Sequence, residues 1–109
     1  GDVHRHFAGT LHGRSNDPER PVIGAEFVAT SITSAGDGTD DPAPMAPVMQ
    51  RNPNLAFTCD RRGYVMHEVS DAQWTSHFRV VSWVTRPDAP LETRRTFVVE
   101  AGAPGLHSA

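Results

Sequence analysis

The amino-terminal segment holds the densest group of potential metal ligands in this chain of 109 residues. Asp2 and His4 are separated by one residue, so if both lie at the carboxyl end of a β-strand, their side chains point to the same side. A carboxylate oxygen and an imidazole nitrogen would then converge on one small volume. Such ligands suit phosphate ester hydrolysis, because paired cations activate water and neutralise charge on the transferring phosphoryl group. An Asp-x-His pattern also arises often by chance, so these residues alone leave a surface turn as the alternative.

The other histidines are not expected to bind metal. His6 continues the alternation, but three side chains of one short strand cannot all reach one ion, so we expect His6 to pack against the site or support it. His12 precedes a turn-like run and is expected to be exposed to solvent. His67 and His77 lie in strand patterns, where a histidine is usually satisfied by its neighbours, and His107 lies in the tail.

An acidic loop and a pair of arginines are the next candidates. Asp37, Asp40 and Asp41 do not have the spacing of a calcium-binding EF-hand loop, so we interpret them as a solvated acidic loop. Arg61 and Arg62 could clamp an oxyanion, but paired arginines before a strand are more often surface charges.

Cys59 is the only cysteine, which excludes a disulfide within the chain. The neighbouring arginines could favour its thiolate, but no base is obviously placed beside it. A nucleophilic role is therefore not expected.

Composition excludes several classes of function. The chain has 10 basic and 13 acidic residues, a net charge of −3, and every basic residue is arginine. Without lysine there is no Schiff-base chemistry. Without a basic stripe, neither a nucleic-acid backbone nor an anionic membrane surface is an expected partner. No apolar run approaches the roughly 20 residues of a membrane helix.

The pattern of apolar residues predicts a mostly β chain of one domain at most. Residues 22–32 are small and apolar on both faces, which is typical of a strand in the interior of a sheet. Residues 33–54 are expected to form a long loop with one helical turn near Met45–Arg51, since three prolines there prevent more. The tail, 101–109, is expected to be frayed or loosely docked. Strands are expected at 22–32, 55–58, 63–69, 74–84 and 92–100, the last three forming an antiparallel run.

Four segments together resemble the alkaline phosphatase D (PhoD-like) family: GDVHRHFAGTL, PVIGAEFVATSITSAGDG, NPNLAFTCDRRGYVMHEVS and DAQWTSHFRVVSWVTRPDAPLETRRTFVVEAGAPG. The resemblance covers almost the whole chain. It implies an α/β fold for the parent domain, a calcineurin-like metallophosphatase layered sandwich, of which residues 1–109 would be the carboxyl-terminal portion, mostly β with antiparallel strands.

The same resemblance implies a metal-dependent phosphomonoesterase or phosphodiesterase that binds iron and calcium and is secreted or extracytoplasmic. Asp2 and His4 match the family's last metal-ligand motif, whereas Cys59 and Tyr64 do not match its ligand positions. His6 and Phe7 depart from the residues usual there. The other ligands lie upstream in the family, so this chain alone is expected to be inactive.

The expected partner is therefore a phosphate ester substrate, with no nucleic acid beyond a possible substrate, no membrane, and no prediction of oligomeric state. The competing hypothesis is a non-catalytic β-rich module that binds a ligand or partner.

Overall fold

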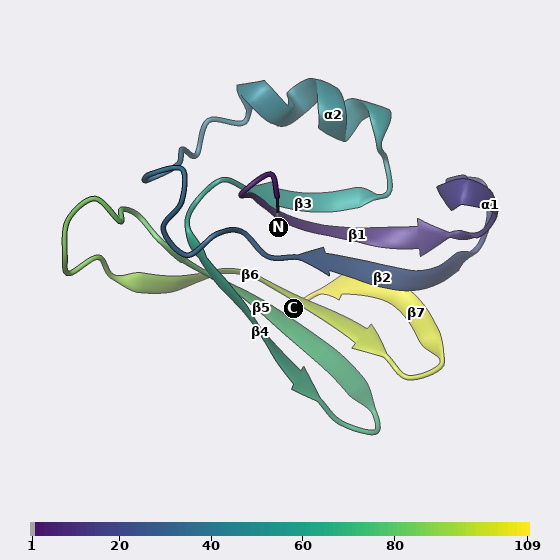
Figure 1. Ribbon diagram of the computed structural model, residues 1–109. Coiled ribbons are helices and arrows are strands. Elements are labelled where there is room, and N and C mark those ends of the chain that lie inside the picture. The colour runs from purple at the N-terminus through teal and green to yellow at the C-terminus, as the bar shows by residue number, and fades with distance from the viewer. Residues whose placement is uncertain (1) are drawn as a thin grey trace.

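The computed structural model describes residues 2–109 and contains two antiparallel sheets packed face to face (Figure 1). The three-stranded sheet has the order β2-β1-β3 and the four-stranded sheet the order β4-β5-β6-β7. The strands are β1 (His6–His12), β2 (Val22–Val28), β3 (Leu55–Cys59), β4 (Gly63–Val69), β5 (Gln73–Val81), β6 (Leu91–Glu100) and β7 (Ala103–Ser108). The mostly β, antiparallel architecture expected from the sequence is confirmed.

Short helical segments complete the fold. The helix α1 (Gly13–Asn16) is a tight turn in which Arg14 and Ser15 have φ of 52° and 55°. The 3₁₀ turn η1 (Ala43–Met45) leads into α2 (Ala46–Arg51), which lies beside β3, the edge strand of the three-stranded sheet (Figure 1). This confirms the single helical segment expected inside the long loop.

The bounds of β4 and β6 agree with the prediction to within one residue, and β4, β5 and β6 form the expected antiparallel run. Two expected strands are shorter than predicted, since 22–32 ends at Val28 and 74–84 ends at Val81. The expectation that 22–32 is an interior strand is wrong, because β2 lies at an edge of its sheet and Ile23 is 66% exposed.

The tail is also not frayed. Residues 103–108 form β7, which pairs with β6 through Phe97–Ser108 and Val98–His107. Gly102, with φ of 78°, lies in the tight turn between the two strands, a conformation that favours glycine. The turn lets the short tail fold back along the sheet and satisfy its backbone groups there.

The core lies between the sheets and is mainly aromatic. Phe78 and Phe97 are almost fully buried, and their rings meet edge to face with centroids 6.0 Å apart. Phe57 from the opposite sheet contacts both, at 5.0 Å and 5.9 Å. Such contacts across the sheets contribute beyond the apolar area they bury. They hold the three-stranded sheet, whose central strand is β1, against the four-stranded one.

Arg62 is wholly buried and ties the long loop to the turn between β3 and β4. Its guanidinium donates to the hydroxyl of Ser31 and the carbonyl of Ser34, each at 2.9 Å, and to the carbonyl and carboxylate of Asp60. The interpretation of Arg62 as a surface charge is therefore wrong. A fork of five donors can satisfy several loop acceptors at once, which explains why arginine is buried here.

Within residues 2–109, no helix is long and apolar enough to cross a membrane.

Candidate functional site

Asp2 and His4 lie just before β1, at the amino-terminal edge of the central strand of the three-stranded sheet. Asp2 is in a turn and exposed, and His4 is half-buried with φ of 53°. The two residues are therefore not in an extended strand, and the alternation argument does not apply to them. Neither side chain makes a hydrogen bond to another of residues 2–109, so both remain free to bind a ligand from outside. Their role as metal ligands stays a prediction.

His6, two residues further on, is a core residue. Its side chain is fully buried, and its ring stands edge to face against Phe78 of β5 with centroids 5.2 Å apart. Its Nδ1 accepts a hydrogen bond from the backbone N–H of Thr30. Burial, together with the positive charge of Arg62, lowers the pKa of His6 to about 4. The imidazole is thus neutral near pH 7, and the packing role expected for His6 is confirmed.

Three other histidines bond to neighbours within the fold. His12 is half-buried rather than exposed, with its Nδ1 2.6 Å from the carbonyl oxygen of Arg20 and its Nε2 2.9 Å from the hydroxyl of Thr10. His67 pairs with the Ser76 hydroxyl at 2.8 Å, and His77 pairs with the Glu68 carboxylate at 2.6 Å.

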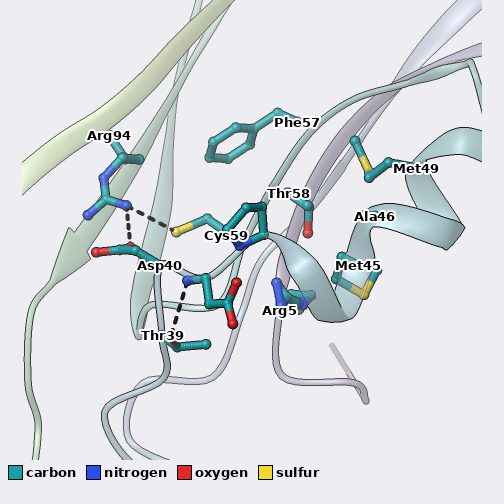
Figure 2. A pocket seen from close by; sticks show the side chains of 12 residues that line it. Arg5, Thr39, Asp40, Met45, Ala46, Met49, Phe57, Thr58, Cys59 and Arg94 are labelled. Carbon is teal, nitrogen blue, oxygen red and sulfur yellow. Dashed lines mark hydrogen bonds and ion pairs between the residues drawn. The ribbon is translucent and has the colours of Figure 1, made fainter.

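A cavity of about 310 Å³ opens beside the amino-terminal segment, between α2, β3 and β6 (Figure 2). Its wall includes Arg5, the residue that directly follows His4. The remaining lining residues come from the loop before α2, from α2 with its preceding turn, from β3 and from β6: Thr39, Asp40, Asp41, Pro42, Met45, Ala46, Met49, Phe57, Thr58, Cys59 and Arg94.

An ion-pair network closes one side of the cavity. The carboxylate of Asp40 accepts from Arg61 at 2.9 Å and from Arg94 at 2.8 Å, and Arg94 also pairs with Glu92 at 2.7 Å. The hydrogen bond from Arg61, followed by that from Arg94, lowers the pKa of Asp40 to about 2. Asp40 is therefore ionised at any ordinary pH.

Asp37 is likewise paired rather than simply solvated. Its carboxylate accepts from the backbone N–H of Val84 at 2.7 Å and from the N–H and hydroxyl of Thr85. The bond from Val84 is the largest cause of its lowered pKa. Asp37 and Asp40 thus hold the loop against β6 and the turn that precedes it, and the Asp40 side chain is at the same time 53% exposed, as expected of a solvated loop.

Arg61 does not present a free oxyanion clamp, since its guanidinium also donates to the carbonyls of Gly38 and Ser82. Cys59 is buried, and its Sγ lies 3.8 Å from Nη1 of Arg94.

Sequence reasoning did not find Arg5, Arg94 or the cavity. Arg94 and Asp40 are 54 positions apart, and only the packing of β6 against the loop brings them together. One feature of the sequence could have indicated Arg5 as a site residue, namely its position between His4 and His6 of the ligand-rich segment. Within residues 2–109, no three His, Cys, Asp or Glu side chains converge as a metal site would require.

Comparison with known proteins identifies the class. The family model for the PhoD-like phosphatases matches residues 1–78, and it includes the segment that carries Asp2 and His4. The chain belongs to the PhoD-like phosphatase family, as the sequence resemblance indicated.

Two relatives give the likeness in detail. Alkaline phosphatase D of Bacillus subtilis (strain 168) is 42% identical over 106 residues, which is 97% of this chain and 18% of that protein. A solved structure described as "Structure of PhoD" superposes with a TM-score of 0.93 and 40% identity, over 100% of this chain and 21% of its own. The chain thus spans about a fifth of the length of these relatives.

Proposed function

We propose that this chain is the carboxyl-terminal portion of a metal-dependent phosphoester hydrolase, a phosphomonoesterase or phosphodiesterase, in which Asp2 and His4 bind metal. The observation that carries the proposal is the family match over residues 1–78 together with the position of these two side chains. Both precede the central strand β1, and neither is occupied by a hydrogen bond within residues 2–109.

The donor chemistry of the two residues fits the iron and calcium that we propose as cofactors. A carboxylate suits both ions, and a neutral imidazole suits iron. Two donors cannot complete a metal site, so the remaining ligands must come from outside this chain. When bound, such cations supply charge neutralisation and water activation for phosphoryl transfer.

The residues of this chain contribute position. Asp2 and His4 are carried on a segment whose next residues enter β1, and β1 is fixed between β2 and β3 by ladder hydrogen bonds. His6, locked against Phe78, fixes the start of that strand. The two donors are thereby held close to a rigid element, as a metal site requires.

The substrate class is a phosphate ester, and we propose a secreted or extracytoplasmic location for the parent protein. Fractionation of the producing cells, with the protein detected by antibody, tests the location. Recovery only with the cytoplasm would contradict it.

Substitution of the two donors tests the function. In the full-length protein, Asp2→Asn and His4→Ala should each lower bound metal and kcat/KM for chromogenic phosphate esters at least about 10-fold, since each removes a direct ligand. Asp71→Asn and His107→Ala, both exposed and far along the chain, serve as matched controls. Unchanged metal content and turnover in both donor variants would refute the proposal and favour the non-catalytic binding module.

A further inference from the structure

The cavity beside the amino-terminal segment is not explained by the two donors, yet it begins next to them. Arg5 forms part of its wall and follows His4 directly. Consecutive Cα atoms are about 3.8 Å apart. An ester held at Asp2 and His4 would therefore have its organic group within reach of the cavity.

Most of the wall is apolar and adaptable. Met45 and Met49, from the helical segment, face Phe57 of β3 across the cavity (Figure 2). Methionine side chains adjust to groups of different shape. A volume of about 310 Å³ lies at the lower end of the range of small-molecule sites, which suits one ring rather than a large ligand.

One polar atom in this wall lacks a partner. The hydroxyl oxygen of Thr58 is buried and makes no hydrogen bond to any of residues 2–109. Buried hydroxyls are normally satisfied, and an orphaned one costs free energy. A bound group that offers a hydrogen-bonding atom would satisfy Thr58.

The charges of the wall argue against a second anion. Asp40 and Arg94 neutralise each other at 2.8 Å. Arg5 and Asp41 are of opposite sign, and neither has an ion-pair partner among residues 2–109. With two positive and two negative side chains, the cavity favours a neutral group over a second phosphate or a carboxylate.

We propose that this cavity is the subsite for the organic group of the phosphate ester, a neutral and largely apolar group of about the size of one aromatic ring. The inference rests on the proposed function, because it requires the phosphoryl group to lie at Asp2 and His4. Met45, Met49 and Phe57 contact the organic group, and Thr58 hydrogen-bonds to it where it carries a suitable atom.

Two non-hydrolysable phosphonates test the subsite by calorimetric titration of the full-length protein. Phenylphosphonate and methylphosphonate carry the same acid group, and only the first has a ring to place in the cavity. Phenylphosphonate should bind at least about 10-fold more tightly. Met49→Ala should reduce its affinity about 5-fold or more and leave the affinity for methylphosphonate unchanged, because the variant removes contacts to the ring alone.

Control variants separate the subsite from general effects. Met66→Ala changes a methionine that is 44% exposed on β4 and should leave both affinities unchanged. Thr58→Val, which replaces the orphaned hydroxyl, should lower the affinity for 4-hydroxyphenylphosphonate relative to phenylphosphonate, whereas Thr33→Val in the exposed loop should not.

The outcomes distinguish the two proposals. Equal affinity for the two phosphonates, or a preference that survives Met49→Ala, would overturn the subsite while an active enzyme leaves the proposed function standing. Binding of neither phosphonate would also overturn the subsite. So would the finding that a segment of the longer protein fills the cavity. Loss of the proposed function is read separately, from the metal content and turnover of the Asp2 and His4 variants.

Discussion

Replacing Arg62, whose guanidinium is buried, should destabilise the fold more than replacing any other arginine of residues 2–109. The variant Arg62→Met keeps the aliphatic stem and deletes the fork. Ser34 retains a partner, because the hydroxyl of Ser31 also donates to its carbonyl at 2.6 Å. Asp60 loses both its charged hydrogen bond and the bond to its carbonyl, and keeps only the N–H of Thr39 at 3.1 Å.

The loss can be estimated from these bonds. A hydrogen bond to a charged group contributes about 1.5–3 kcal/mol, and an unsatisfied buried carbonyl costs about 1–3 kcal/mol. The carboxylate of Asp60 is 27% exposed, so water recovers part of the first contribution. We therefore expect a decrease of about 3 kcal/mol in the free energy of unfolding, within the range for breaking a buried ion pair.

Urea denaturation followed by tryptophan fluorescence measures this decrease. Arg51→Met is the matched control, because Arg51 lies on the exposed side of α2 and donates only to Pro47 of its own helix. The control should change stability by no more than about 0.5 kcal/mol. A midpoint for Arg62→Met that coincides with that of Arg51→Met, at equal slope, would refute the clamp role of Arg62.

Three further predictions follow from other parts of the chain. Asp40 has a folded pKa of about 2 against an ordinary 3.8, so the stability it contributes is present above pH 4 and is lost as pH falls toward 2. Because the side chain is 53% exposed, the loss should stay below about 1 kcal/mol. Urea midpoints at pH 5 and pH 2.5 measure this loss, which should be absent in Asp40→Asn. Gly38→Ala should destabilise the fold well beyond Gly36→Ala in the same assay. Both glycines have positive φ, which costs about 1–2 kcal/mol for alanine, but only at Gly38 would the new Cβ overlap the carbonyl oxygen of Asp60. Equal urea midpoints of the two variants would contradict that close approach. The isolated 109-residue chain should show no metal-dependent turnover of chromogenic phosphate monoesters or diesters with added iron and calcium, since it carries only two of the proposed donors of a two-metal site. Turnover of about 10 per second would show that the chain alone is sufficient for catalysis.

Local patterns predicted the parts of the fold that local physics controls. The strand expected at 74–84 is present as β5, Gln73–Val81. Prolines and glycines between 33 and 54 limited the helix to a short segment, as observed in α2. These features depend on neighbours within a few residues, so a single sequence contains them.

Pairing between distant segments was the part that could not be predicted. Residues 101–109 hold one large apolar side chain, Leu106, and the edge of β6 gives them a ladder to join. β1 carries Gly9 and Thr10 between its apolar positions, yet it is the central strand of its sheet because β2 and β3 pair on either side. Partners supply that position, and composition does not reveal them.

The candidate site shows the same division in its own residues. The types and spacing of Asp2 and His4 indicated metal chemistry, but the strand geometry first invoked for them does not hold, since His4 has φ of 53°. What fixes their position is His6, an imidazole that burial keeps neutral and that packs against Phe78 of the opposite sheet. This contact between the sheets therefore positions the segment that carries Asp2 and His4. Because Arg5 lies between His4 and this anchor, the same contact also places one residue of the wall of the adjacent cavity, so the proposed metal ligands and part of the proposed subsite depend on one packing interaction.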